Sequence, residues 1–210
     1  LISAEERGDK ESINIDLIST RAQYEPGSSL KIFSIGLALK KGLLDEKTEY
    51  YVEDTIELIE NSCQKDFKGY KGCYKDFLKH EPYNLSVKEI IERSSNVGTI
   101  IATKDLNIND LEEFLSKFGF SKRTGIELSG ESKGSFDPNK TCTTCLSSLS
   151  IGYSINVTQM QMVKAYSIIA NGGKNVDLTL IKAPYSNYSP NQVIESNSSE
   201  RLKNLLINVV

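Results

Sequence analysis

Residues 24–31 of the chain read Tyr-Glu-Pro-Gly-Ser-Ser-Leu-Lys, and a nearly continuous apolar run follows them as far as Leu39. The Pro-Gly pair and the serine after it, Ser28, are residue types that helix starts favour. Two lysines and Gly42 close the run, and glycine commonly ends a helix. The stretch therefore predicts a buried helix that has Ser28 at or just inside its amino end.

Ser28 and Lys31 stand three residues apart on this predicted helix. Side chains at that spacing share one helix face, with Cβ atoms about 5–6 Å apart. A serine nucleophile without a histidine needs another base, and a lysine whose pKa is lowered by burial can serve. The backbone N–H of a serine at a helix amino end can also donate to a developing oxyanion. We therefore predict Ser28 as the nucleophile and Lys31 as its base.

The same residues allow plainer interpretations. Ser28 taken alone is more often a helix cap than a nucleophile. Ser29 competes for the role of nucleophile, but no lysine follows Ser29 at a distance of three residues. His80 is the only histidine of the chain and lies in a charged stretch, so it is interpreted as a surface residue.

A second polar box, residues 94–96 with the sequence Ser-Ser-Asn, begins 66 residues after Ser28. It stands at the end of a predicted helix over 85–92, in which Ser86 and Glu89 form a capping box. Alone, the box would be interpreted as the polar end of that helix. The serine–lysine pair of residues 28–31 and the box at residues 94–96 are far less expected to occur together by chance than either is alone.

Helical patterns dominate the rest of the chain. Helices are predicted over 97–106, over 110–118 with Asn109 as the cap, over 158–170, and from 199 onward. Residues 120–138 are glycine-rich and predict a surface loop, and residues about 50–83 predict an irregular insert with short strands. Strands are also expected at the beginning of the chain and after Gly173.

The chain has 210 residues, 39% of them hydrophobic and 25% charged, which suits one domain with one sizeable core. Its net charge of -3, with dispersed basic residues, gives no footprint for nucleic acid or for an anionic membrane surface. No apolar run approaches the roughly 20 residues that span a bilayer, and no signal peptide is recognised. Because the chain opens at Leu1 as if inside a strand, we expect it to be a fragment of a longer protein.

Four cysteines fall into two pairs: Cys63 and Cys73 are ten residues apart, and Cys142 and Cys145 form a Cys-x-x-Cys. An even count suits an oxidised compartment, whereas a Cys-x-x-Cys could also be a metal half-site or a redox pair. Zinc needs about four ligands, so with one histidine we favour disulfides or free thiols. We therefore expect no metal ion at these cysteines.

The two boxes place the chain near a known family. Residues 24–31 resemble the nucleophile box of class B penicillin-binding proteins, and residues 94–98 resemble the second box of that superfamily. Further stretches are similar to the same family in the same order: 118–128, 150–161, 165–166 and 170–173. The Glu-Pro before the nucleophile box resembles the division-associated members. The third box, Lys-Thr-Gly, does not occur; residues 122–125 resemble it only superficially.

The resemblance implies an α+β fold, the penicillin-binding-protein transpeptidase or serine β-lactamase-like fold, in which a helical subdomain packs on an antiparallel sheet. Residues 1–210 would form one partial transpeptidase domain, incomplete in this chain, with the insert near 50–83. The membrane anchor before it and the Lys-Thr-Gly strand after it would lie outside the chain, so we expect the fragment alone to be inactive.

The implied activity is that of a peptidoglycan D,D-transpeptidase that cross-links stem peptides in septal wall synthesis. Ser28 would form the acyl-enzyme, Lys31 would remove its proton, Ser94 would pass a proton to the leaving amine, and Asn96 would hold the substrate amide and keep Lys31 in place. β-Lactams would trap the acyl state, and the resemblance implies that no metal and no organic cofactor is needed.

Implied partners are stem peptides, β-lactams and other division proteins, with no nucleic acid. The implied location is the bacterial inner membrane, reached through a segment outside this chain, with the catalytic domain on the periplasmic or outer face. Two other functions stay open: a class D β-lactamase or β-lactam sensor domain, and a non-catalytic division scaffold.

Overall fold

A computed structural model describes residues 3–4, 15–16, 18–64, 72–137, 142–182 and 190–209. Its helices are α1 (Ile18–Arg21), the 3-10 helix η1 (Gly27–Leu30), α2 (Lys31–Lys40), α3 (Val87–Glu92), α4 (Asn96–Thr103), α5 (Ile108–Lys117), α6 (Cys145–Ser150), α7 (Gln159–Ala170) and α8 (Ser196–Leu206). Its strands are β1 (Ser3–Ala4), β2 (Ile15–Asp16), β3 (Glu49–Val52), β4 (Thr55–Glu57), β5 (Cys73–Lys75), β6 (Tyr83–Ser86), β7 (Ser135–Phe136) and β8 (Ile155–Asn156).

The strands of the described residues form four antiparallel pairs: β1 with β2, β3 with β6, β4 with β5, and β7 with β8. The larger antiparallel sheet of the expected fold is not found among these residues. None of the described helices is both long and apolar enough to cross a membrane.

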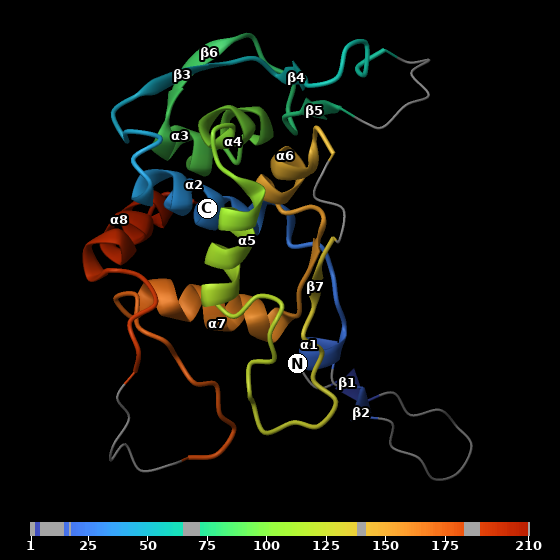
Figure 1. Ribbon diagram of the computed structural model, residues 1–210, viewed down its shortest axis with the longest axis vertical. Coiled ribbons are helices and arrows are strands. Elements are labelled where there is room, and N and C mark those ends of the chain that lie inside the picture. Colours follow the sequence, from blue (N-terminus) through green and yellow to red (C-terminus); the bar gives the residue numbers. More distant parts are fainter. Residues whose placement is uncertain are drawn as a thin grey trace.

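Helix α2 is the centre of the core. Every residue of it except Lys40 is buried, and it contacts α3, α4, α5 and α8 (Figure 1). The ring of Phe33 meets three other rings edge to face, with centroids 4.9–5.5 Å apart: Phe118, Phe120 and Tyr166. Such edge-to-face pairs add to the free energy gained by burying the rings. The helix that begins beside Ser28 is therefore the most firmly embedded element of the described fold.

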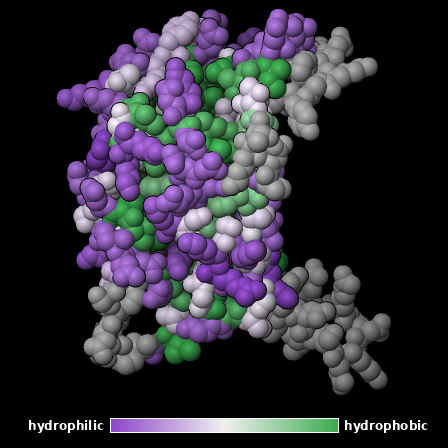
Figure 2. Space-filling view, in the orientation of Figure 1, coloured by the Kyte–Doolittle hydropathy of each residue, from purple (hydrophilic) through white to green (hydrophobic). Residues whose placement is uncertain are grey.

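Polar residues cover most of the face seen in Figure 2, and hydrophobic residues gather on it only in smaller patches. Helix α5 illustrates the cause, because Leu111, Phe114 and Leu115 are buried whereas Lys117 pairs with Glu113 on its outer side.

Most predicted helices are confirmed, with shifted boundaries. The capping box of Ser86 and Glu89 starts α3 as expected. The predicted cap of α5 is wrong: Asn107, not Asn109, is the cap, because the Asn107 side chain accepts from the Asn109 N–H. Helix α4 ends at Thr103, before the predicted residue 106, and α8 begins at Ser196, three residues earlier than predicted.

The segment over 50–83 is more regular than predicted. Its described part pairs β3 with β6 and β4 with β5, and a disulfide joins Cys63 to Cys73. Residues 65–71 lie outside the described residues. The strand expected after Gly173 is not found in the described part of that region, where only an isolated bridge links Lys174 and Gln192. The predicted loop over 120–138 contains the short strand β7.

Gln161, on α7, fastens the loop before β7 to that helix. Its side chain is fully buried, and its Nε2 donates to the carbonyls of Lys122 and Lys133, each at 2.7 Å. Its Oε1 accepts from the Thr158 N–H at 2.8 Å, which completes a capping box. One side chain therefore bonds three backbone groups, of which the Thr158 N–H is buried.

Replacing Gln161 by methionine should lower the free energy of unfolding by about 1–3 kcal/mol, because it leaves the buried Thr158 N–H and the carbonyls of Lys122 and Lys133 without their side-chain partner. Urea unfolding followed by circular dichroism measures the loss. Gln159→Met, on the exposed side of the same helix, is the matched control and should change stability by less than about 0.5 kcal/mol. Equal losses in the two variants would contradict the role given to Gln161.

Candidate active site

The serine predicted as nucleophile lies on an exposed turn. Ser28 belongs to η1, and the α-helix proper begins at Lys31. Gly27 has a φ of 55°, in the left-handed region that favours glycine. The Ser28 side chain is exposed, and among the described residues no hydrogen bond engages its hydroxyl. The prediction that a helix starts here is confirmed, with a 3-10 turn at its amino end.

The 3-10 turn improves the geometry expected for the pair. Side chains at positions i and i+3 eclipse one another in a 3-10 helix. Ser28 stands in η1, and the Lys31 N–H donates to the Ser28 carbonyl. The side chains of Ser28 and Lys31 therefore leave the backbone on the same side.

A segment far along the chain holds this turn in place. The backbones of Tyr24 and Val157 exchange two hydrogen bonds, at 3.0 and 2.9 Å, and the Gly27 N–H donates to the Gly152 carbonyl at 3.0 Å. The Glu25 carboxylate accepts from the Ser154 N–H at 2.9 Å. Residues 152–157 thus support the turn that carries Ser28.

Helix α7 supports the turn from another side. The Tyr166 hydroxyl donates to the Ser29 carbonyl at 2.8 Å, and the Ser29 hydroxyl donates to the Pro26 carbonyl at 2.7 Å. Burial raises the pKa of Tyr166 to about 12, so the phenol remains a donor at neutral pH. Ser29 is committed to the turn, which agrees with its rejection as nucleophile.

Lys31 is buried, with 2% of its surface exposed. Its Nζ donates to the carbonyl of Ser94 and lies 3.2 Å from the Ser94 hydroxyl. Desolvation lowers the pKa of Lys31 to about 8, and the charge of Asp76 opposes that shift. An amine in this range is neutral often enough near neutral pH to accept a proton.

Ser94 stands at the turn between α3 and α4, with its side chain exposed. Its φ of 54° lies in the left-handed region, which is uncommon for a residue other than glycine and frequent at functional sites. Ser95 is buried, and its hydroxyl caps α4 by accepting from the Gly98 N–H at 2.8 Å. The second box is therefore the start of α4 as well as the end of α3.

The expected contact between Asn96 and Lys31 is not found among the described residues. The Nδ2 of Asn96 donates to the Lys75 carbonyl at 2.7 Å, and within the described residues the contacts that hold Lys31 come from Ser94. The structure thus brings together Lys31 and Ser94, places Ser28 one turn away, and sets Asn96 beside β5.

Sequence reasoning missed Asp76, which follows β5. Its Oδ1 accepts from the N–H groups of Asn96 and Val97 at 2.6 and 3.0 Å, and its Oδ2 accepts from the Ser95 hydroxyl at 2.7 Å. A carboxylate at a helix amino end is favoured by the unpaired N–H groups there. No sequence signal marked it, because its segment was interpreted as an irregular insert and the two partners stand about 20 residues apart.

The interpretation of His80 as a surface residue also needs correction. His80 is half-buried, its Nε2 lies 3.1 Å from Asp76 Oδ2, and its ring stacks on Tyr83 with centroids 4.2 Å apart. The residue is therefore part of the structure behind the second box and not a free surface histidine.

All four cysteines are paired, Cys63 with Cys73 and Cys142 with Cys145. Among the residues that the structure describes, no group of three or more histidine, cysteine or acidic side chains could hold a metal ion. The hydroxyl of Tyr74, next to Cys73 on β5, lies 2.6 Å from the hydroxyl of Ser148 on α6. The strand that leads to Asp76 is thus fastened at both of its faces.

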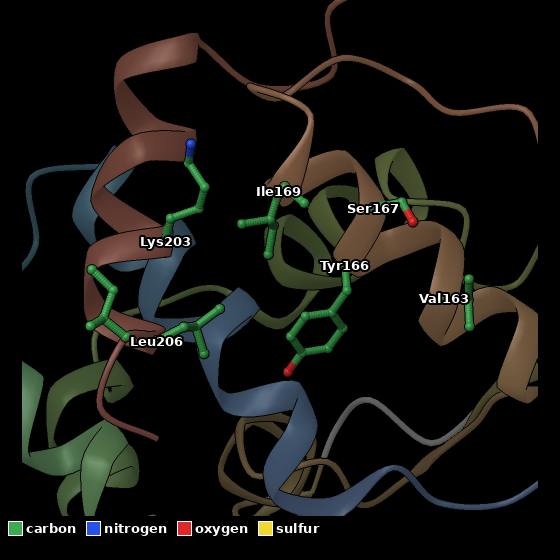
Figure 3. A pocket seen from close by; sticks show the side chains of 8 residues that line it. Val163, Tyr166, Ser167, Ile169, Lys203 and Leu206 are labelled. Atoms are coloured by element: carbon green, nitrogen blue, oxygen red, sulfur yellow. The ribbon is translucent and has the colours of Figure 1, made fainter. Parts of the chain in front are cut away.

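A pocket of about 520 Å³ lies between α7 and α8 (Figure 3). Apolar side chains such as Val163, Ile169 and Leu206 line it, with Lys203 at its edge. Tyr166 borders it, and the hydroxyl of this residue is the one that donates to the Ser29 carbonyl. Neither Ser28 nor Lys31 lines this pocket, so it is separate from the candidate site.

Comparison with known proteins identifies similar sequences. Residues 3–210 match the family described as the penicillin binding protein transpeptidase domain. The chain is 31% identical to the peptidoglycan D,D-transpeptidase FtsI of Buchnera aphidicola subsp. Schizaphis graminum over 167 residues, 79% of this chain and 27% of that protein. It is 28% identical to the penicillin-binding protein PbpB of Mycolicibacterium smegmatis over 79% of this chain and 24% of that one. The chain thus spans about a quarter of these relatives.

Solved structures agree in fold. Penicillin binding protein 3 of Mycobacterium tuberculosis, complexed with ampicillin, superimposes with a TM-score of 0.79 at 25% identity, covering 96% of this chain and 44% of that one. A peptidoglycan glycosyltransferase from Burkholderia ambifaria gives a TM-score of 0.80 at 20% identity, covering 94% and 59%. The predicted α+β fold of this family is confirmed.

Gly152 leaves no room for a side chain, because a Cβ there would lie 2.0 Å from the Gly27 carbonyl oxygen. Gly152→Ala should therefore lose about 2 kcal/mol more stability than a glycine replaced in open space. Gly172→Ala is the matched control: both glycines have positive φ, 87° and 67°, but a Cβ at Gly172 meets nothing within 4 Å. Thermal unfolding compares the two, and equal losses would contradict the close approach.

Proposed function

Because the chain belongs to the penicillin-binding protein transpeptidase domain family, we propose that it forms part of a peptidoglycan D,D-transpeptidase that works through an acyl-enzyme at Ser28. One observation carries the assignment of residues: a buried lysine of lowered pKa, Lys31, stands one 3-10 turn from an exposed serine and contacts a second serine, Ser94. That arrangement supplies a nucleophile, a base and a proton carrier without histidine.

The proposed reaction begins when neutral Lys31 takes the proton of the Ser28 hydroxyl. Ser28 Oγ forms a bond to the carbonyl carbon between the two terminal D-alanines of a stem peptide, and the C–N bond breaks. The proton passes from Lys31 through the Ser94 hydroxyl, 3.2 Å away, to the leaving nitrogen. An amine of a neighbouring stem peptide then attacks the acyl carbon and forms a new C–N bond. The ester bond between that carbon and Ser28 Oγ breaks, and the proton lost by the amine returns to Ser28 Oγ through Lys31.

Asn96 holds the substrate in this proposal. Its Nδ2 is committed to the Lys75 carbonyl, which directs the amide oxygen to accept an N–H of the stem peptide. β-Lactams acylate the same serine. No step calls for a metal or an organic cofactor.

Septal synthesis is the favoured setting, since the relatives include proteins named FtsI. Other division proteins are then the expected partners, and a membrane segment outside these residues anchors the domain. Two disulfides support a location on the periplasmic or outer face of the membrane, because disulfides persist in oxidising compartments. Neither the β-lactamase or sensor function nor the scaffold function gains support from any relative named here.

The nucleophile is tested by labelling the natural protein that carries this sequence with a fluorescent penicillin. Ser28→Ala should abolish the covalent label, because no other hydroxyl stands one 3-10 turn before Lys31. Ser29→Ala, its neighbour, should retain the label within about tenfold, the loss of one supporting hydrogen bond. Intact labelling of Ser28→Ala would refute the assignment.

The role of Lys31 predicts how labelling depends on pH. With a pKa of about 8, the neutral fraction of Lys31, and with it the acylation rate, should rise about fivefold from pH 7 to pH 8 and level off above pH 9. Lys31→Arg should lose the label, since a guanidinium stays charged. An acylation rate that does not vary over this range would exclude Lys31 as the base.

A further inference from the structure

His80 lies between two oxygen acceptors. Its Nε2 is 3.1 Å from Asp76 Oδ2, and its Nδ1 is 2.9 Å from the Glu81 carbonyl oxygen. A neutral imidazole carries one N–H, so one ring nitrogen would point a lone pair at an oxygen. The imidazolium donates from both nitrogens. The geometry of the site therefore fits the charged form of His80.

The surroundings of the ring reinforce this preference. Stacking on Tyr83, with ring planes 18° apart, fixes the orientation of the imidazole. Asp54 and Asp76 supply negative charge near the His80 ring. Arg93 lies over Tyr83, on which His80 stacks, with its guanidinium 4.9 Å from the Tyr83 ring centroid.

The same contacts set the titration of His80. Desolvation disfavours the charged ring, but the hydrogen bonds to Glu81 and Asp76 and the charges of Asp76 and Asp54 outweigh it, so the pKa of His80 is raised above its ordinary value. On the other side of the second box, Lys31 of α2 interacts with the charge of Asp76.

Asp76 links His80 to the catalytic side chains. With His80 in place, its carboxylate accepts four hydrogen bonds, from the His80 ring, the Ser95 hydroxyl and the N–H groups of Asn96 and Val97. Its side chain is 7% exposed, and a buried carboxylate needs such partners. The three residues that the Asp76 carboxylate holds come immediately after Ser94 in the chain. The carbonyl and hydroxyl of Ser94 contact Lys31.

We propose that His80 is a positioning residue for acylation: by holding the Asp76 carboxylate it fixes the turn of Ser94 and Asn96, and through Ser94 it fixes the Lys31 amine. The proposal rests on the proposed function of this site. His80 touches neither substrate nor nucleophile, and the chain of contacts runs from His80 through Asp76 and the Ser94 turn to Lys31.

The ion pair between His80 and Asp76 depends on pH. The folded state favours protonated His80, so the ion pair is complete at pH values below the ordinary pKa of histidine and is lost as the pH rises through the raised value. Deprotonation of Lys31 increases the acylation rate over the same range, so the rate alone does not isolate His80. The ratio of wild-type to variant rates does, because Lys31 is common to both.

The experiment compares the natural protein that carries this sequence with His80→Asn, whose amide can still donate one neutral hydrogen bond to Asp76. Acylation rates with a fluorescent penicillin should differ about fivefold at pH 6, the difference between a charge-assisted and a neutral hydrogen bond, and should converge to within about twofold at pH 9. Lys79→Asn, an exposed neighbour, should match wild type at every pH. A ratio that does not change with pH, or a His80→Asn rate equal to wild type throughout, would overturn the proposal.

A second measurement does not depend on activity. NMR titration of the His80 ring should give a pKa that falls when Asp76→Asn removes the carboxylate, and the Asn96 amide resonance should titrate with His80 in wild type. If the chemical shift of the Asn96 amide stays constant while His80 titrates, the proposal is also overturned. Labelling of Ser28→Ala separates the two hypotheses: if its label persists, the proposed nucleophile fails, while the NMR result still decides the link between His80 and Asn96.

Discussion

The burial of one cation, Lys31, governs the arrangement of the site. An ammonium with 2% of its surface exposed is stable only where acceptors replace water, and here the carbonyl and hydroxyl of Ser94 do so. This requirement draws the turn between α3 and α4 against the amino end of α2. It also places Ser94 in a left-handed conformation, which the surrounding contacts must stabilise. Desolvation, the cost of this burial, is also what lowers the pKa of Lys31.

Local patterns in the sequence predicted the parts of this arrangement that depend on local chemistry. The apolar run after Ser28, the capping box of Ser86 and Glu89, and the spacing of Ser28 and Lys31 each reflect interactions within one turn of helix, and the structure agrees with them. The predicted cap of α5 differs by two residues because Asn107 and Asn109 are the same residue type, and residue type alone does not distinguish them.

The contacts that position the second box were not predictable in the same way. Asp76 and Asn96 meet across about 20 residues, and the hairpin that brings them together depends on the pairing of β4 with β5 and on the disulfide between Cys63 and Cys73. Polar residues without a helical period gave no sign of this pairing. The segment interpreted as an irregular insert therefore supplies the carboxylate on which the start of α4 depends.

The support behind the turn that carries Ser28 bears on how the protein is made. Glu25 and Ser154 are separated by 129 positions in the chain, and the bonds from Tyr24 and Gly27 to Val157 and Gly152 span a similar distance. Contacts of long sequence separation form late in folding, since a large loop must close first. During synthesis on a ribosome, the turn with Ser28 emerges before residues 152–157 and stays without this support until they have followed it. The site is thus assembled only after most of these residues have been translated.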